Sequence, residues 1–388
     1  MWLLQLRLPG QYRNNRVYQN RQNFSGQAKT EDGAVVFSIY KKYGLTTGKL
    51  GMLSDIRVSC SPHISERFST RSVMIDVIIA LAPAMGWAGY YFRIHAPILI
   101  ATCVISCVAT EWLCNLIRKK PNSLDDFSAV VTGVILALSL PPSLPVWAAV
   151  IGSVVSIAIG KMVFGGLGGN IFNPAMVGRT FLTVSFGVLM TSWTVPASID
   201  PAMPAVAQEN TLDARTQATP LAWSKLAIKN ELGADVYSGQ QFEATFTGEV
   251  GGCLGETSVI ALLIGGIYLL IRRTINFHIP LAVLSAAFVF AGIAYLIDSY
   301  VYVQPFFHLT SGGLFLCAFF IATDPVTAPL THRGMWVFGI GVGTLTMLIR
   351  IVGEYPEGIM FSILLMNAVT PLIDRFFKKI PAGGKSGG

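Results

Sequence analysis

The sequence predicts an all-α polytopic membrane protein with about ten transmembrane helices in two inverted-repeat halves, which contain broken or re-entrant helices. Hydrophobic residues make up 52% of the 388 residues and charged residues only 13%, whereas about 25% of the residues in a soluble domain are charged. Apolar runs close to the ~20 residues of a membrane-spanning helix recur along the chain. Interruptions marked by glycine and proline occur in both halves. These observations exclude a water-covered surface for most of the chain.

The apolar runs form two groups of five, one on each side of a long polar interval. The first group covers residues 72–92, 96–117, 128–141, 145–163 and 174–192. The second group covers residues 255–271, 279–297, 311–323, 334–352 and 356–374. The third and eighth runs are short for a full crossing of the hydrocarbon core. We therefore expect a first five-helix half over residues 52–192 and a second over residues 255–375.

The positions of lysine and arginine predict the orientation in the membrane. On the ten-span count, the basic loops all lie on one side, which is the cytoplasmic side by the positive-inside rule. Their residues are Arg67, Arg71, Arg118, Lys119, Lys120, Arg272, Arg273, Arg333, Arg375, Lys378 and Lys379. The interval 193–254 instead holds seven acidic and three basic residues. We expect both termini in the cytoplasm of a bacterial cell, the chain in the inner membrane, and residues 193–254 outside. The net charge of +7 then reflects topology, so nucleic acid is not an expected partner.

The two ends of the chain differ in composition from the rest. Residues 1–51 contain Gln, Asn and Arg clusters and no apolar run long enough for a span. They are expected to be a poorly ordered cytoplasmic extension, or to precede a true start at Met52. Residues 376–388 are expected to form a flexible cytoplasmic tail.

Both halves contain a break in which a helix cannot continue cheaply. Four glycines lie within residues 165–169, and Pro174 suits the start of a new helix. In the second half, residues 311–313 open the eighth run and Asp324-Pro325 closes it. Half-helix ends at such breaks could face an anionic or electron-rich ligand, or the glycines could serve close helix packing alone. The motif Asn173-Pro174-Ala175 is similar to a water-channel signature, but the second copy that such a channel needs is missing.

The ionisable residues inside the apolar runs include Asp76, Glu111, Lys161 and Arg350, and charge is functional by default there. Asp76, Lys161 and Arg350 are within two turns of an interface, so snorkelling to the water is a sufficient explanation for them. Glu111 remains as a weak candidate for an ion path. The cysteines of the second run have no spacing typical of zinc or iron–sulfur ligands and are expected to be small packing residues.

Thr219 lies in the polar interval, directly before a proline. Pro220 disfavours the helical region for Thr219 and favours an extended backbone that presents the hydroxyl group. A modifying enzyme can read such a threonine as a linear motif. On the residues alone, an ordinary loop threonine is the simpler interpretation.

The segment that begins at Asp213 resembles the flavinylation motif of the membrane subunits of bacterial redox-driven ion pumps. In that motif, Asp-x-x-Ser/Thr-Gly-Ala-Thr receives FMN through a phosphoester on its last threonine. The resemblance implies that Thr219 carries covalent FMN and that Asp213, Thr216 and Ala218 are motif residues. Gln217 stands where the pattern usually has glycine.

Residues 54–375 resemble the same family, which includes the D subunits of the Rnf complexes and the B subunits of the sodium-pumping NADH:quinone oxidoreductases. The similar stretches are Ser61-Pro62-His63, Ser69-Thr70-Arg71, Thr132-Gly133, and residues 138–142, 165–179, 322–327 and 353–358. The Ser-Pro-His opening favours the Rnf type, because the quinone-reductase type lacks it. Residues 1–51 fit neither.

The resemblance implies a membrane subunit of a redox-driven Na⁺ or H⁺ pump, in which the covalent FMN relays electrons between ferredoxin- and NAD-linked partner subunits. The implied partners are the other subunits of an Rnf complex, a flavin transferase and membrane lipid. A second, non-covalent flavin is expected by analogy only. No Gly-rich nucleotide-binding fingerprint follows a strand, and neither a catalytic residue nor a metal ligand is expected, so the chain would be one part of a translocase.

Two other functions remain open on the sequence. One is that of the B subunit in a Na⁺-translocating NADH:quinone oxidoreductase. The other is a stand-alone channel or transporter for a small solute, since such proteins also have inverted halves. A flavin on Thr219 would discriminate an electron-transfer protein from a channel.

Overall fold

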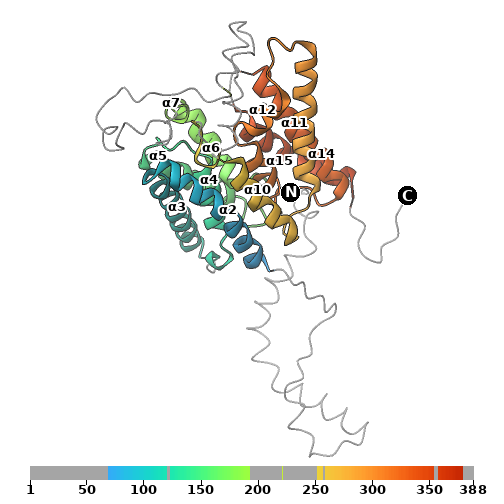
Figure 1. The fold of residues 1–388 in the computed structure, drawn as a ribbon. Coiled ribbons are helices and arrows are strands. Elements are labelled where there is room, and N and C mark those ends of the chain that lie inside the picture. Colours follow the sequence, from blue (N-terminus) through green and yellow to red (C-terminus); the bar gives the residue numbers. More distant parts are fainter. Residues whose placement is uncertain are drawn as a thin grey trace, which may run out of the picture. The chain divides into compact units, whose positions relative to one another are not determined.

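The computed structural model describes residues 69–119, 123–192, 221, 251–256, 258–353 and 357–378. Residues 1–51, almost all of the interval 193–254 and most of the tail 376–388 lie outside these ranges. From residue 67 onward the chain forms one compact unit. Within the described ranges the regular elements are helices and no β-strand occurs (Figure 1). The all-α fold class is therefore confirmed.

The first helical group contains α2 to α7. Its elements are α2 (Thr70–Phe92), α3 (His95–Ile117), η2 (Leu124–Asp126), α4 (Ser128–Leu138), α5 (Val146–Ile157), the π-helical turn η3 (Ala158–Met162), α6 (Pro174–Ser185) and α7 (Gly187–Met190). The expected fifth run is interrupted at Phe186, so it is two helices and not one. The other four runs of this half each coincide with a helix.

The second helical group contains α10 to α15. Its elements are η6 (Leu254–Glu256), α10 (Val259–Ile271), α11 (His278–Ile297), α12 (Pro305–Thr310), α13 (Leu314–Leu316), the π-helical turn η7 (Cys317–Ile321), α14 (His332–Ile351) and α15 (Ile359–Phe376). The sequence did not predict α12. The expected eighth run is the short pair α13 and η7, which fits its limited length.

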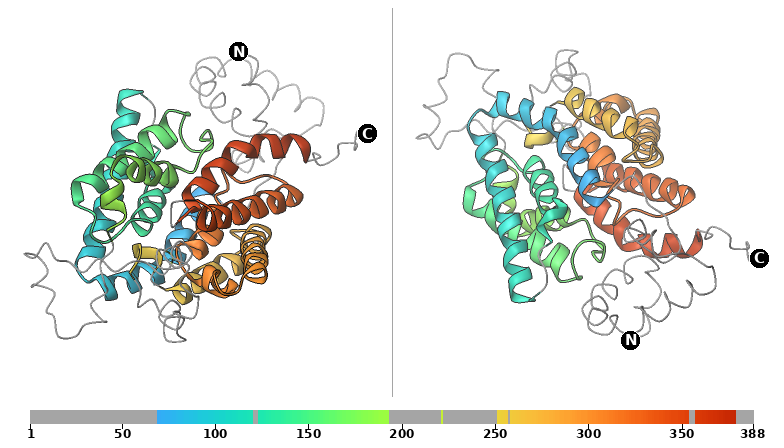
Figure 2. Two further views of the ribbon diagram at one scale, coloured as in Figure 1. Left: turned by 90° about the horizontal axis from the view of Figure 1, so that it is seen from above. Right: turned by 90° about the horizontal axis from the view of Figure 1, so that it is seen from below.

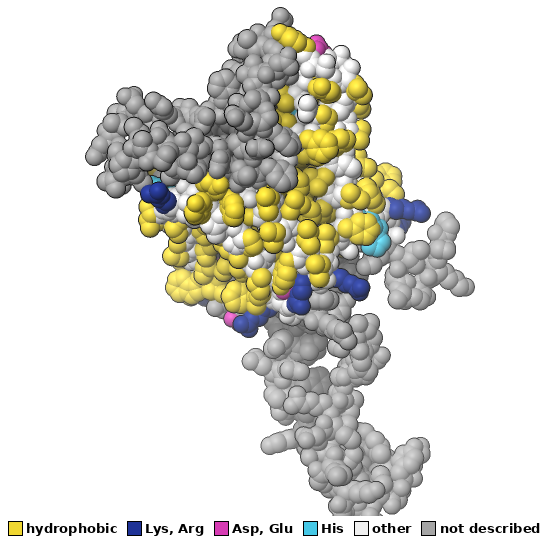
Figure 3. Space-filling model, in the orientation of Figure 1, with side chains coloured by type: hydrophobic (Ala, Val, Ile, Leu, Met, Phe, Trp, Pro, Cys, Tyr) yellow, Lys and Arg dark blue, Asp and Glu magenta, His cyan; other side chains and the backbone are white. Residues whose placement is uncertain are grey.

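Five of these helices are long and apolar enough to cross a membrane. They are α2, α3, α11, α14 and α15, whereas α4, α10 and the pair α5–η3 are shorter apolar helices. A broad surface of hydrophobic side chains covers the described helices (Figure 3). The chain is therefore a multi-pass membrane protein by the length and composition of its helices, while the count of ten crossings stays a prediction.

Side chains at the helix starts explain several of the boundaries. Ser69, Ser258 and Thr331 each accept a hydrogen bond from a backbone N–H of the first turn of α2, α10 and α14, which satisfies a donor that the helix itself cannot pair. Asn173 does the same for α6, and Pro174 follows at the first helical position, where its missing N–H costs nothing. These four boundaries are therefore fixed by local chemistry.

The two helical groups lie side by side (Figure 2), and two pairs of α-helices and the short turn η6 contribute to the contact between them. Helix α2 packs on α10, and α6 packs on α15. A Cβ atom on Gly265 of α10 would collide with the backbone carbonyl of Ala80 in α2. A Cβ on Gly178 of α6 would likewise collide with Ser156 of α5. Small residues thus let these backbones approach closely, as is typical of helix packing in membranes.

Candidate functional site

A cavity lies between the two helical groups at the breaks that the sequence predicted. Together with the open solvent at its mouth, its space amounts to about 710 Å³. Its polar lining residues are Ser128, Thr132, Lys161, Asn170 and Asn173 from the first group, and Thr274, Thr323 and Asp324 from the second. Phe319 and Phe320 add aromatic surface. An apolar pocket with a few convergent polar groups is the usual form of a binding site.

The Asn173-Pro174 break forms one wall of the cavity. The Asn173 side-chain oxygen accepts hydrogen bonds from the backbone N–H groups of Ala175 (3.1 Å) and Met176 (3.3 Å). Its amide nitrogen donates to the carbonyl of Ile321 at 3.4 Å, at the end of η7. One side chain therefore caps α6 and connects the breaks of the two helical groups.

Asp324 forms part of the opposite wall. Its carboxylate accepts hydrogen bonds from the backbone N–H of Val326 (3.2 Å) and the hydroxyl of Thr327 (3.1 Å). The predicted correspondence of Asn173-Pro174 and Asp324-Pro325 thus has a physical counterpart, because both pairs line the same cavity.

Asn170 brings a polar atom with unsatisfied bonding capacity to the cavity. Its side-chain nitrogen donates to the carbonyl of Phe172 at 3.1 Å. Its side-chain oxygen is buried and has no hydrogen-bond partner among the described residues. A buried acceptor without a partner costs free energy, so a ligand that donates a hydrogen bond here would be favoured.

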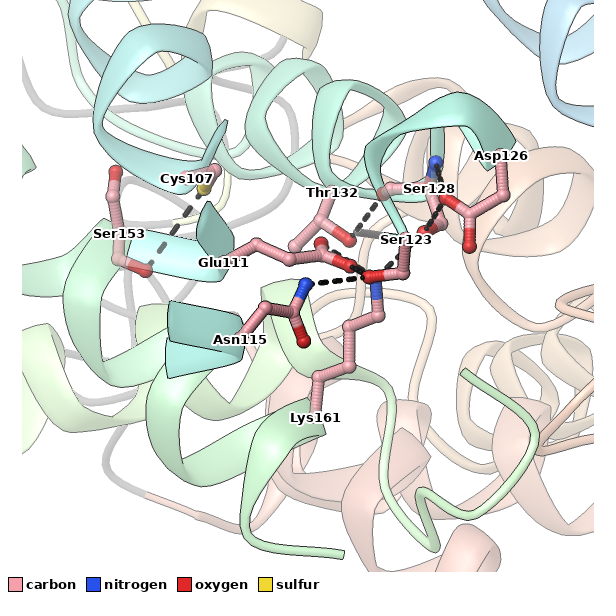
Figure 4. A network of polar contacts seen from close by, with 9 residues as sticks. All are labelled: Cys107, Glu111, Asn115, Ser123, Asp126, Ser128, Thr132, Ser153 and Lys161. Atoms are coloured by element: carbon pink, nitrogen blue, oxygen red, sulfur yellow. Dashed lines mark hydrogen bonds and ion pairs between the residues drawn. The ribbon is translucent and has the colours of Figure 1, made fainter. Parts of the chain in front are cut away.

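A buried polar network, which we call the lysine network, adjoins the cavity and contains Lys161, Glu111, Ser128, Ser123 and Asn115 (Figure 4). Lys161 Nζ donates to both oxygens of Glu111 (2.8 and 2.6 Å) and to Ser128 Oγ (2.6 Å). Ser123 Oγ donates to Glu111 at 2.6 Å and accepts from Asn115 at 2.9 Å. All three donors of the ammonium group are therefore used.

The burial of the lysine network corrects part of the sequence analysis. Glu111 is 0% exposed and Lys161 is 1% exposed, so Lys161 does not snorkel to water. The same holds for Arg350, which is 2% exposed and donates to the carbonyls of His308 (2.6 Å) and Ser311 (3.1 Å). Asp76 is also buried and accepts from Arg272. The snorkelling explanation is wrong for all three residues because each head group has partners inside the protein.

A second charged group, the carboxylate cluster, consists of Arg179, Cys253, Glu256 and Glu357. Arg179 Nη2 forms an ion pair with Glu357, lies 3.8 Å from Glu256 and donates to Cys253 Sγ at 3.3 Å. Glu357 also accepts from the backbone N–H of Gly313 at 2.9 Å. The thiol and the two carboxylates have ligand atoms within 4.8 Å of one another, which is a spacing that a metal ion could use. The Arg179 guanidinium contacts all three groups and so compensates part of the negative charge of the two carboxylates.

The carboxylate cluster was missed at the sequence level. Arg179 and Glu357 were seen only as parts of the similar stretches, and their contact joins α6 to the segment before α15. A pairing across 178 residues leaves no local pattern.

The structure does not describe the predicted flavin site. Thr219, Asp213, Thr216 and Ala218 lie outside the described residues, so their roles remain predictions. Leu221, two residues after Thr219, is described and is only 4% exposed. A Cβ on Gly312 would come within 2.7 Å of Leu221 Cδ1 and 2.8 Å of Arg350 Nη2. The chain at Leu221 therefore packs beside Arg350 and the carboxylate cluster.

Helical spans, buried ion pairs and an interior cavity define the class as a multi-pass membrane protein that holds charge inside its helical bundle. A family model described as the NQR2, RnfD, RnfE family matches residues 57–383. The chain belongs to this family.

Relatives with assigned names align over most of their length, and each is named as the D component of an ion-translocating complex. The chain is 44% identical over 328 residues to that of the Na(+)-translocating ferredoxin:NAD(+) oxidoreductase complex of Acetobacterium woodii, covering 84% of this chain and 94% of that one. It is 41% identical over 332 residues to the proton-translocating counterpart of Clostridium ljungdahlii, covering 84% and 96%. It is 36% identical over 352 residues to that of the ion-translocating oxidoreductase complex of Erwinia tasmaniensis, covering 85% and 99%.

Proposed function

We propose that this chain is the RnfD-type membrane component of an ion-translocating ferredoxin:NAD oxidoreductase complex. The alignment with the Acetobacterium woodii protein over 94% of its length carries the proposal. The chain would work as one part of an oxidoreductase and translocase, with the other subunits of the complex as partners. The family description also names NQR2, but the relatives reported above are all D components of their complexes.

The proposed cofactor is FMN, attached to Thr219 through a phosphoester, with Asp213, Thr216 and Ala218 as the motif that a flavin transferase reads. Leu221, which is buried beside Gly312 and Arg350, indicates where the attachment segment would lie. Two residues of extended chain span at most about 7 Å. The FMN would thus be tethered close to Arg350 and to the carboxylate cluster, whose fixed charges would surround the site of electron transfer.

We propose the cavity between the helical groups as the site of a second, non-covalent flavin. The unpaired oxygen of Asn170 offers an acceptor to a ring N–H, and Phe319 and Phe320 offer apolar surface for a planar ring. When bound, a flavin would supply one- and two-electron chemistry there. Asn170 would orient it through this acceptor.

For the architecture, we propose ten crossings in two inverted halves. The packing supports this because α3 contacts α5 in the first group as α11 contacts α14 in the second, and α5 contacts α6 as α14 contacts α15. The membrane would be the bacterial inner membrane with both termini in the cytoplasm. Several Lys and Arg side chains lie along the lower edge of the hydrophobic surface in Figure 3, as this orientation requires of the cytoplasmic side, and others lie at its right and upper left.

The coupled ion would be Na⁺ or H⁺. Glu111 remains the weak candidate for the ion path, although its carboxylate now has Lys161 as a partner. An ion could use Glu111 only when this pair opens. Ion transport that is unchanged in Glu111→Gln would remove the residue from the path.

In-gel fluorescence tests the flavin assignment. The full chain is produced in a host with the flavin transferase and run on a denaturing gel under ultraviolet light. We expect a fluorescent band that disappears in Thr219→Ala and remains in Thr216→Ser, which keeps a hydroxyl in the motif. A dark wild-type band overturns the covalent flavin and favours the stand-alone channel as the alternative.

A further inference from the structure

Lys161 lies at the border of the cavity and the lysine network, and the function proposed so far gives it no task. We propose that the Lys161 ammonium compensates the negative charge that an electron brings to the ligand of the cavity. Lys161 would thereby be a positioning residue that sets the redox potential of that ligand. The inference rests on the proposed second flavin and names the residue that tunes it.

The geometry places the two charges of the ion pair unequally with respect to the cavity. Lys161 and Ser128 belong to its lining, and Glu111 does not. The ammonium is held by three acceptors, at 2.6 to 2.8 Å, two of them the oxygens of Glu111. The ammonium of this buried ion pair therefore belongs to a residue that lines the cavity, and the carboxylate belongs to one that does not.

The backbone around Lys161 keeps this ion pair in place. Lys161 lies in the π-helical turn η3, where Val163 N–H donates to the carbonyl of Ala158 at 3.0 Å. A Cβ on Gly160 would lie 2.9 Å from the Pro174 Cα atom, so η3 rests directly on the start of α6. Such π-helical turns occur frequently at functional sites.

Burial makes the electrostatic effect of the ion pair strong. Lys161 and Glu111 are at most 1% exposed, so salt and water screen them little, and charges interact more strongly at low effective dielectric constant. Asp324, on the opposite wall, adds a carboxylate, but its contribution is common to every variant of the lysine network. An added negative charge in the cavity is then favoured by Lys161 and disfavoured by Glu111.

The electron balance needs one donor. A reduced iron–sulfur or flavin carrier of a partner protein in the complex loses one electron, and the ligand in the cavity gains it together with one negative charge. No covalent bond of the chain changes in this step. Lys161 keeps its proton and supplies the compensating charge from about the same position.

Substitutions of Lys161 and of Glu111 should therefore shift the redox potential of the ligand in opposite directions. Lys161→Met removes the positive charge while keeping an unbranched side chain, so the oxidised ligand should be favoured. Glu111→Gln leaves the ammonium without its counter-charge, so the reduced ligand should be favoured. Lys161→Arg keeps the charge and is the matched control. A pair that serves stability alone would not produce shifts of opposite sign.

The test is a redox titration of the full chain in lipid nanodiscs, in a Thr219→Ala background that leaves only non-covalent flavin. At the midpoint potential of this parent, Lys161→Met should lower the ratio of reduced to oxidised flavin at least tenfold, which is about 59 mV for one electron. Glu111→Gln should raise the ratio, and Lys161→Arg should change it less than threefold. Shifts of the same sign in Lys161→Met and Glu111→Gln, or none, overturn the inference.

Flavin content separates this inference from the function on which it rests. A Thr219→Ala parent that releases no flavin on denaturation overturns the cavity assignment and the inference with it. Normal flavin content with unchanged potentials overturns the inference alone. If Lys161→Met retains no flavin, oxidised and reduced riboflavin are titrated into the stripped protein, because the ratio of the two dissociation constants reports the same shift. An equal loss of affinity for both forms then counts against the proposal.

Discussion

The side-chain amide of Asn173 donates a hydrogen bond to the backbone carbonyl of Ile321 at 3.4 Å, across 148 residues of sequence. The same side chain caps α6. A single residue thus links the break of the first helical group to that of the second, at the wall of the cavity.

Asn173→Ala should destabilise the protein by more than the loss of a helix cap alone. Replacing a cap by alanine costs about 1 kcal/mol, and the lost bond to Ile321 adds about another 1 kcal/mol. Thermal unfolding in detergent measures the change. Ser69→Ala, which removes a cap that bonds the first turn of its own helix α2, is the control and should cost about the first amount. Equal costs for both variants would contradict the linking role.

The lysine network should show strong coupling between its two charges. Breaking a buried ion pair by removing one partner costs about 3–5 kcal/mol, so Lys161→Met and Glu111→Gln should each lower the unfolding free energy by this order. The double variant should cost much less than the sum of the two, because no unpaired charge is left buried. Denaturant unfolding of the four proteins gives the coupling energy, and additive effects would refute the ion pair.

The guanidinium geometry of Arg179 should be required in the carboxylate cluster. Arg179→Lys keeps the charge, but a single ammonium cannot reproduce a planar group that contacts Glu357, Glu256 and Cys253 at once. We expect a loss of roughly 2 kcal/mol in stability, as for a damaged buried charge network. Arg272→Lys is the control, since that guanidinium is 49% exposed and should tolerate the change. Similar melting temperatures for both variants would argue against the cluster as a structural unit.

The proposed orientation can be tested with an impermeant maleimide. In a background with Cys60 and Cys114 replaced by serine, Gln240→Cys should be labelled from outside intact cells or right-side-out vesicles. Arg273→Cys, in a basic loop, should be labelled only after the membrane is opened. The reverse pattern would show that residues 193–254 face the cytoplasm.

Local sequence signals predicted the helices well and the charged contacts poorly. The apolar runs coincide with helices because hydrophobic length and the caps at Ser69, Ser258 and Thr331 act within a few residues of the boundary. The break at Asn173-Pro174 was likewise visible because proline and glycine act locally. By contrast, α12 was missed because it is a helix of only six residues, too short to give a recognisable apolar run.

The pairing of Lys161 with Glu111 shows why the site was only partly predictable. Both residues were recognised as charges inside apolar runs, yet each was judged by its own distance from an interface. The packing of α3 and η3 decides their pairing, and no single-residue pattern contains that contact. The signal that could have predicted the pairing was the presence of one acidic and one basic residue, Glu111 and Lys161, inside apolar runs of the same half. Thr219 was found by resemblance alone and remains a prediction.

The backbone contact of Gly265 with Ala80 limits how the two helical groups can move. Helices that touch backbone to backbone cannot slide without a collision, and the bond from Asn173 to Ile321 holds the same interface elsewhere. A solute transporter that rocks one half against the other needs a plane of slip between them, and these contacts oppose one. Electron tunnelling has the reverse requirement, since its rate falls steeply with distance. An interlocked pair of helical groups is suited to keeping redox partners at a constant separation.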